Sequence, residues 1–271
     1  MEFKQNGEHT KQYRNVMRKI IINCFALLFI CFNVYAQNSS FLKSGTIVFE
    51  KKINKFAILK KRINSQNESY MQPAYDNYIK NEGQFITLQS TLFFTENASL
   101  YQPNATSFEK NDLIDFTVAK QSNTVFTDFV SQNRVAQKNI YGKSYLIKDS
   151  LRNINWKITD EVRNIAGYNC KRATAIFMDS IYVVAFYAEE IMCASGPESF
   201  SGLPGMILGI ALPSQHITWF ATKVTAGVPS NNLSQPFTGK PTNYATFKNI
   251  MESKLKMTKQ LTYIDFLLLL L

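Results

Sequence analysis

The chain is poor in the residues on which nucleophilic and acid–base catalysis most often depends. Its 271 residues include two histidines and four cysteines, and His9 lies in an N-terminal segment that we expect to be removed. His216 would then be the base in any Ser/His/Asp or Cys/His mechanism. It follows the polar turn sequence Pro213-Ser214-Gln215, so we interpret it as an exposed turn histidine.

Ligand sets for metals and phosphates are also lacking. One histidine and two distant cysteines give no zinc-ligand spacing. Gly202 and Gly205 precede an apolar run typical of a strand, whereas phosphate-binding glycine loops precede a helix. We therefore predict no metal, no cofactor and no nucleotide site.

Acidic residues offer a weak alternative. Glu189-Glu190 and Glu198 could form a glycosidase pair at a separation of roughly 5–9 Å. Neighbouring residues on a strand point to opposite faces, so Glu189 and Glu190 cannot both line one cleft without a bulge. We assign no catalytic residue and keep as the alternative a periplasmic hydrolase that uses His216 or paired carboxylates.

No apolar run is long enough to span a bilayer, which takes roughly 20 residues. Residues 20–34 are apolar, follow the basic pair Arg18-Lys19 and end at Val34-Tyr35-Ala36. A basic segment, an apolar segment and a small-residue cleavage site are typical of a secretory signal peptide. We predict a signal peptide over residues 1–36, a mature chain that begins at Gln37, and no transmembrane span in that mature chain.

The start and the end of the chain each leave a question open. Met17 is an alternative start to Met1, because the segment before Arg18 is long for a signal peptide. Residues 260–271 end in the apolar run Phe266 to Leu271. That run is too short to span a membrane, and either an artefact of sequence or reading frame or an anchor would explain it.

The net charge is strongly positive and its carriers are scattered. The whole chain carries +10, and about +7 remains once residues 1–36, with five basic and two acidic residues, are removed. Such a balance favours encounters with anionic surfaces such as lipid head groups. An exported chain without basic and aromatic residues interleaved is not expected to bind nucleic acid.

Alternating apolar and polar residues predict strands along most of the chain. In residues 45–54, Ile47, Phe49 and Ile53 share one parity, while Glu50 and Lys52 share the other. Residues 60–83 and 101–120 are polar insertions, the first with at most a short helix because Pro73 interrupts it. Further strands are expected at 86–94, 125–129, 144–148, 156–160, 206–212 and 217–222.

Two later segments complete the predicted fold. Residues 169–177 and 181–187 are rich in β-branched and aromatic side chains around Asp179-Ser180, which predicts a hairpin. Tyr244, Phe247, Met251 and Leu255 recur at helical spacing. We predict a mainly β, β-rich α+β domain over residues 37–259, with a curled antiparallel sheet or partial barrel and a C-terminal amphipathic helix.

Cys170 and Cys193 flank this hairpin and would be the two cysteines of the mature chain. An oxidising compartment permits a bridge between them, and closing the loop would contribute about 3 kcal/mol. The alternatives are a small buried thiol and a reactive cysteine activated by Lys171 and Arg172. We predict the disulfide with these alternatives open.

The most distinctive segment joins two turn signals to an apolar run, Gly196-Pro197 and Ser201-Gly202-Leu203-Pro204-Gly205-Met206-Ile207-Leu208. Pro204-Gly205 suits the centre of a type II turn. The segment resembles the signature of the GLPGLI family of exported Gram-negative envelope proteins. Blocks at 155–158, 165–173 and 239–247 resemble the family's flanking blocks, although Phe186-Tyr187 stands where the family more often has Trp-Tyr.

The resemblance implies location and architecture without an activity. Gly196, Pro197, Gly202, Leu203, Pro204 and Gly205 are the motif positions, and they either form a structural corner or present Leu203 to a partner. We expect an exported periplasmic or outer-membrane-associated protein. Its expected role is that of a non-enzymatic binding or accessory protein, whose partner is an outer-membrane receptor or transporter or an apolar or anionic envelope ligand.

Overall fold

The computed structural model describes residues 14, 17–20, 41–105, 116–121, 123–178, 180–229, 233–257 and 263–271. The chain divides into two units, residues 1–40 and 41–271. In the first unit the described residues are helical, and the predicted cleavage site at Ala36 lies outside them. The second unit includes the apolar tail, which sequence reasoning had set apart from the domain.

The second unit is built on one sheet of twelve strands with a few helices. The predicted β-rich fold is confirmed. The elements are β1 (Gly45–Asn54), α2 (Lys55–Arg62), α3 (Glu68–Asn81), β2 (Phe85–Phe94), β3 (Ala98–Pro103), α4 (Thr117–Lys120), β4 (Asn123–Asp128), β5 (Asn133–Ile140), β6 (Lys143–Ser150), β7 (Lys157–Ile165), β8 (Tyr168–Phe177), β9 (Ile181–Ala188), β10 (Met206–Leu212), η2 (Pro213–Gln215), β11 (Ile217–Ala226), β12 (Lys240–Thr242), α5 (Tyr244–Met257) and α6 (Tyr263–Leu270).

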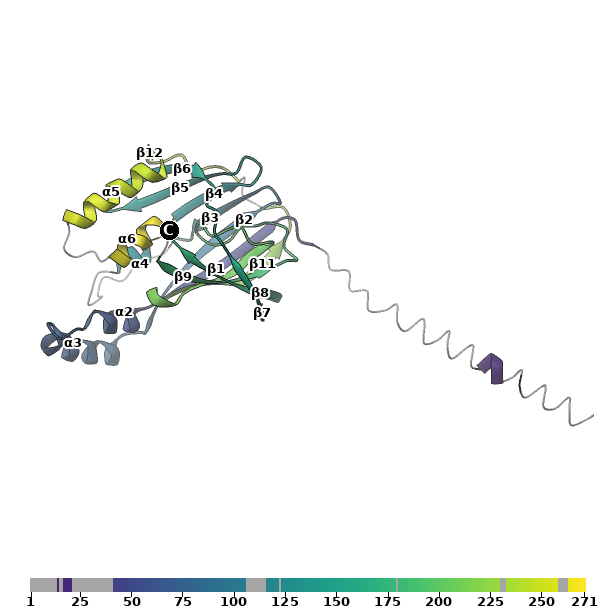
Figure 1. Ribbon diagram of the computed structural model, residues 1–271, viewed down its shortest axis with the longest axis horizontal. Helices are drawn as coiled ribbons and strands as arrows, with labels where there is room; N and C mark the ends of the chain where they lie inside the picture. The colour runs from purple at the N-terminus through teal and green to yellow at the C-terminus, as the bar shows by residue number, and fades with distance from the viewer. Residues whose placement is uncertain are drawn as a thin grey trace, which may run out of the picture. The chain divides into compact units, whose positions relative to one another are not determined.

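The sheet is open and mixed. Its strand order is β12-β6-β5-β4-β3-β2-β1-β11-β10-β9-β8-β7. Neighbouring strands are antiparallel except at one edge, where β12 pairs in parallel with β6. The expected antiparallel arrangement is therefore corrected at this edge. Figure 1 shows the sheet curling, with α6 between the half that holds β4, β5 and β6 and the half that holds β1, β9 and β11.

Alternation in sequence accounts for the inner face of the sheet. Ile47, Phe49 and Ile53 of β1 are fully buried, as expected for side chains of one parity in a half-buried strand. The predicted hairpin is also present, because Phe177 of β8 pairs with Ile181 of β9. Strands β1 and β10 have the bounds that their apolar patterns predict.

Two predictions about the polar insertions were wrong. Residues 60–83 hold the last three residues of α2 and the fourteen-residue helix α3, with Pro73 inside it. The helix accommodates this proline on an exposed face, and Tyr78 is its buried anchor against Leu59. The strands β3 and β5 were missed because their polar residues obscure the alternation.

Helix α5 matches the predicted C-terminal amphipathic helix. The Asn243 side chain accepts a hydrogen bond from the Thr246 amide at 2.8 Å, which caps the first turn. Phe247 and Met251 are buried, and the Phe247 ring lies 5.4 Å from the ring of Tyr145 on β6. Among the described residues, no helix has the length and apolarity required to cross a membrane.

Candidate binding site

The most unusual feature of the second unit is that its last helix occupies the interior of the sheet. Every side chain from Phe266 to Leu271 is at most 9% exposed. These residues belong to the same apolar core as the inner faces of the strands. The tail is therefore part of the packed domain, and its uniform apolarity matches an environment without water. We call the interior space that α6 fills the cradle.

Side chains from distant parts of the chain hold the end of α6. Lys138 on β5 donates to the Leu269 carbonyl at 3.1 Å, and Arg152 after β6 donates to the Leu270 carbonyl at 2.9 Å. The Ser199 hydroxyl donates to the Leu271 carbonyl. The last carbonyls of a helix lack intrahelical partners and carry partial negative charge. The cradle thus meets the negative end of α6 with cationic donors.

Arg134, Lys138 and Arg152 form what we call the basic cluster. Arg134, Ala136, Lys138 and Ile140 alternate along β5 and are all buried, so two cations stand on the inner face of the sheet. Burial, together with the nearby Arg152 and Arg134, lowers the pKa of Lys138 to about 7. Burial also lowers the pKa of Arg134 to about 9, with Arg152 adding to the shift. Like charges are therefore held close together in a desolvated place.

Arg152 lies at the boundary between the cradle and a surface groove. Its guanidinium is 4.3 Å from the Tyr244 ring centroid and 5.3 Å from that of Phe177. The groove, with a volume of about 400 Å³, is lined by Arg152, Tyr244 and Phe177, among others. The Nη1 atom of Arg152 is buried without a hydrogen-bond partner. The Nη2 atom of this guanidinium thus bonds to α6, and its Nη1 atom has no hydrogen-bond partner.

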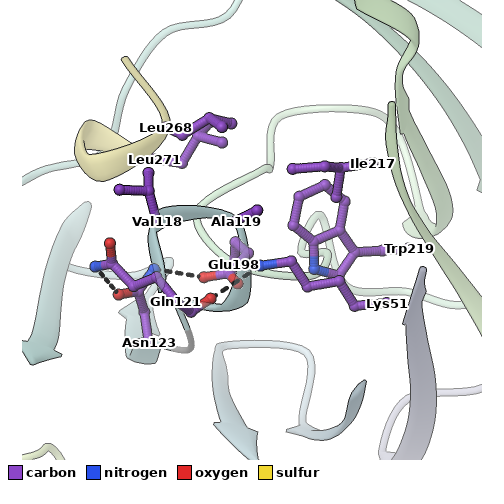
Figure 2. A pocket seen from close by; sticks show the side chains of 10 residues that line it. All are labelled: Lys51, Val118, Ala119, Gln121, Asn123, Glu198, Ile217, Trp219, Leu268 and Leu271. Atoms are coloured by element: carbon purple, nitrogen blue, oxygen red, sulfur yellow. Dashed lines mark hydrogen bonds between the residues drawn. The ribbon is translucent and has the colours of Figure 1, made fainter. Parts of the chain in front are cut away.

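A second polar group lies deeper in the cradle, and we call it the Glu198 cluster (Lys51, Gln121, Asn123 and Glu198). Figure 2 shows the Lys51 ammonium and the Glu198 carboxylate pointing toward one another, with Leu268 and Leu271 of the tail nearby. Asn123 donates to Glu198 at 2.8 Å, and Lys51 donates to the Gln121 carbonyl at 2.9 Å. The space among these side chains is about 10 Å³, room for roughly one water molecule.

Burial shifts both charged members of the Glu198 cluster toward neutrality. The pKa of Lys51 falls to about 8 because burial outweighs the opposing attraction of Glu198. The pKa of Glu198 rises above its ordinary value because burial outweighs Lys51 and the Asn123 hydrogen bond. Lys51 also lies 4.9 Å from the ring centroid of Trp219. Two opposite charges thus attract one another in the core, and each has a polar hydrogen-bond partner of its own.

The distinctive glycine- and proline-rich segment delivers Glu198 to this place. Residues 194–205, here called the signature loop, fold back on themselves through hydrogen bonds from the Gly202 amide to the Ala194 carbonyl and from the Ile207 amide to the Ser195 carbonyl. Glu198 has φ of 54°, an uncommon conformation for a residue other than glycine. A residue that is buried, charged and in a rare backbone conformation is a candidate functional group.

The motif positions have mainly structural roles. Leu203 is 2% exposed, so the structure corrects the alternative that it is presented to a partner. A Cβ on Gly205 would lie 2.2 Å from the Ala188 carbonyl oxygen, and one on Gly196 would lie 2.8 Å from the Ile207 Cβ. Pro197 is buried as well, whereas Gly202 and Pro204 are exposed.

The turn at Pro204-Gly205 differs from the prediction. Gly205 has φ of 147°, whereas a type II turn requires about 80° at that position. The Gly205 amide donates to the Leu203 carbonyl at 2.8 Å. This hydrogen bond joins residues two apart in the sequence, whereas that of a type II turn joins residues three apart. The close packing of Gly205 on Ala188 of β9 sets this geometry. The sequence preferences of turns do not include such a contact, because it is made with a different strand.

The residues of the hydrolase alternative do not converge. His216 is half-buried in the turn before β11, and burial with the nearby Lys61 lowers its pKa. Glu189 pairs with Lys171 at 2.9 Å on the surface, while Glu198 is 4% exposed and bonded to Asn123. The described residues contain no group of three or more His, Cys, Asp or Glu side chains placed to hold a metal ion.

Cys170 and Cys193 are free and buried in the structure, which corrects the predicted bridge. Strand pairing places Lys171 opposite Tyr187, so Cys170 stands level with Ala188 and the chain turns away before Cys193. Burial raises the pKa of both thiols to about 12. The reactive-thiolate alternative is therefore disfavoured too, because the nearby Lys171 does not offset desolvation.

The family described as "Protein of unknown function (Porph_ging)" matches residues 177–209, a stretch that contains the whole signature loop. The match supports an uncharacterised family and does not confirm the GLPGLI name. No curated protein matches the chain.

The solved structures that match the chain include two with the following descriptions. "Structure of PNGF-II in C2 space group" matches with a TM-score of 0.49 at 12% identity, covering 77% of this chain and 32% of that one. "Structure of PNGF-II in P21 space group" matches with a TM-score of 0.46 at 13% identity, covering 77% of this chain and 33% of that one. The chain thus spans about a third of the length of those structures.

Sequence reasoning missed the cations of the cradle, although a signal existed. Lys51 has the same parity as Ile47, Phe49 and Ile53 in β1, and Lys138 has the same parity as Ile140 in β5. A charged residue at an inward position of a strand is a polar group that must find a partner in the core. No comparable signal exists for Arg152, whose place depends on how β6, β8 and α5 pack.

Proposed function

We propose that this protein is a non-enzymatic binding protein of the cell envelope that holds an apolar chain in the cradle, where α6 now lies. The observation that carries the proposal is the burial of Phe266 to Leu271 inside the sheet. An interior that accepts a rod of apolar side chains about 9 Å long, with donors for its polar end, is suited to an apolar ligand with one polar end.

The strand ladder does not depend on α6. The twelve strands pair with one another in the stated order, and the hydrogen bonds described above to the end of α6 come from the side chains of Lys138, Arg152 and Ser199. The helix can leave without breaking a strand pair. Each large side chain it withdraws loses about 1.5–3 kcal/mol of burial, so a ligand must replace that apolar contact.

Envelope location is the second part of the proposal. Its support is the signal peptide predicted over residues 1–36 and the family match around the signature loop. Mass spectrometry of the native protein should find Gln37 at the N-terminus. An intact residue 20–34 segment in the mature protein would contradict export with cleavage.

Native purification tests the binding role directly. Mass spectrometry of the purified protein should detect co-eluting lipids, or a co-eluting outer-membrane protein if the role is accessory to transport or assembly. Recovery of the protein alone, together with hydrolytic turnover on a substrate panel that is lost in His216→Ala, would favour the hydrolase alternative.

A full-chain measurement tests the cradle itself. We expect the neutral fluorophore N-phenyl-1-naphthylamine to bind and to raise amide exchange in residues 263–271, because the bound probe displaces α6. Exchange in β1 and β5 should fall or stay the same. Binding without any change in residues 263–271 would place the probe elsewhere and contradict the proposal.

Two matched variants sharpen this measurement. Leu268→Glu puts a charge on a 9%-exposed side chain of α6, while Met257→Glu makes the same chemical change at an 85%-exposed position of α5. We expect Leu268→Glu to strengthen probe binding several-fold, because the charge opposes the docking of α6. Met257→Glu should bind as the unchanged protein does. If Leu268→Glu does not fold, the exchange measurement on the unchanged chain decides alone.

A further inference from the structure

The chemistry of the basic cluster goes further than an apolar cavity requires. We infer that the ligand is an anionic amphiphile, a single acyl chain that ends in a carboxylate or phosphate, and that Lys138 and Arg152 bind its acidic head. This inference rests on the proposed function and names its ligand class. Four observations support it: the charge balance, the unused donor, the nature of the current acceptors and the groove.

The charge balance inside the cradle leaves cations in excess. Asp149 stands opposite Arg134 in the pairing of β5 with β6, so one cation of the basic cluster has an acidic neighbour. Glu198 is already bonded to Asn123 and faces Lys51. Asp149 also attracts Arg152, and Glu198 also attracts Lys138. Among the described side chains, these two acids thus face the four cations Lys51, Arg134, Lys138 and Arg152, and this surplus of positive charge favours an anion.

The acceptors that now face Lys138 and Arg152 are neutral. Both donate to main-chain carbonyls of α6, Leu269 and Leu270. An ionised acceptor makes a hydrogen bond roughly twice as strong as a neutral one. An acid in the same place would therefore compete well against the end of the helix.

Arg152 has the geometry to hold an acid with two donors. Its Nη2 atom serves Leu270, and its Nη1 atom is buried without a partner. A guanidinium binds carboxylate and phosphate groups in a bidentate way. Stacking on Tyr244 and Phe177 fixes the plane of this guanidinium, so little further ordering is needed on binding.

The groove beside Arg152 supplies a route. It has about 400 Å³ of volume and includes Arg152, Tyr244 and Ile154 in its lining. Arg152 thus lines the groove and also contacts α6. A ligand held there would keep its head near the surface and extend its acyl chain into the volume that the leucines of α6 occupy.

A competition experiment on the full chain tests the head-group preference. Dodecanoate, dodecyl phosphate and neutral dodecanol are titrated against bound N-phenyl-1-naphthylamine. We expect at least one anionic compound to displace the probe at roughly tenfold lower concentration than dodecanol, as expected for a hydrogen bond to a charged group. Preference for dodecanoate would identify a free carboxylate, and preference for dodecyl phosphate a lipid-like phosphate.

Variants of the cluster locate the effect. Arg152→Gln and Lys138→Met should each reduce the advantage of the anionic competitor over dodecanol by about tenfold. Both variants also remove a hydrogen bond to α6, so the probe and dodecanol should bind as well as before or better. Arg172→Gln and Lys148→Met are the controls, because Arg172 pairs with Glu161 and Lys148 is exposed on β6. Retained probe binding also shows that each variant is folded.

The outcomes separate this inference from the proposed function. Equal displacement by anionic and neutral competitors, with no effect of Arg152→Gln, would overturn the anionic head and leave the apolar cradle standing. Failure of the probe and of all three competitors to bind would overturn the proposed function itself. Weakening of the anionic competitor in the control variants would show a general charge effect and overturn the assigned site.

Discussion

The two charged clusters in the cradle differ in where their partners come from. In the Glu198 cluster, Asn123 bonds to Glu198 and Gln121 bonds to Asn123, so most of these polar groups bond to one another, while the Gln121 Oε1 atom has no partner. In the basic cluster, Lys138 and Arg152 donate to a helix that no strand pair requires. Buried charge that is satisfied internally holds the fold together, whereas buried charge that faces a displaceable element is available to a ligand.

Removal of Glu198 should have the largest effect. In Glu198→Ala, Lys51 remains buried without its carboxylate and Asn123 loses its acceptor. We expect a loss of about 3–5 kcal/mol in the free energy of unfolding, measured by urea denaturation. Glu189→Ala is the control, because its exposed pair with Lys171 should contribute less than about 1 kcal/mol. Equal effects of the two substitutions would break the comparison.

The signature loop should be nearly as sensitive. Gly205→Val places a Cβ 2.2 Å from the Ala188 carbonyl oxygen at a φ of 147°, so the loop must move and take Glu198 with it. Strain and overpacking together predict about 2–4 kcal/mol of destabilisation, seen as a lower melting temperature. Gly83→Val is the control because a Cβ there meets nothing within 4 Å. An unchanged melting temperature in Gly205→Val would contradict the packing described here.

The basic cluster should instead cost stability, and pH reveals the cost. The pKa of Lys138 is about 7 in the folded protein and about 10.4 in an unfolded chain. Between pH 7 and 8.5 the unfolded chain binds more protons at this group, so its contribution makes stability rise with pH. Lys51, with a pKa of about 8, acts in the same direction.

Lys138→Met isolates this contribution. The curve of unfolding free energy against pH should be flatter in the variant between pH 7 and 8.5, with a stability at pH 7 equal to or above that of the unchanged protein. The two cysteines, whose pKa values rise to about 12, act in the opposite direction above pH 8.5 but are common to both proteins. A steeper curve in Lys138→Met would show that the lysine is stabilising.

Reduction should have the smallest effect. Because Cys170 and Cys193 are free and buried, the packing around these two side chains does not depend on a bridge between them. We expect two titratable thiols after denaturation without reductant, and the same melting temperature with and without reductant. Zero thiols on a monomer would show that the predicted bridge forms after all.

Sequence reasoning predicted the strands with clean alternation and failed where polar residues intervene. Residues 45–54 and 206–212 form strands with the predicted bounds, since apolar residues occupy most of the inward positions there and Lys51 alone interrupts them in β1. Strand β5 was missed because Arg134 and Lys138 occupy inward positions. The hairpin was predicted correctly. The position of Cys193 relative to its strands was not, because a turn after Ala188 redirects the chain.

The sequence by itself determined the β-rich class, the capped amphipathic helix α5 and the position of the turn at Gly205, because periodicity and backbone preference act over a few residues. Only the tertiary structure decided that Glu198 and Lys51 meet, that Arg152 joins a groove to the cradle, and that the final leucines lie in the core. These depend on contacts between segments far apart in the sequence, such as Thr222 with Val48, which are 174 residues apart, and on the curling of an open sheet around a helix that its strands do not need.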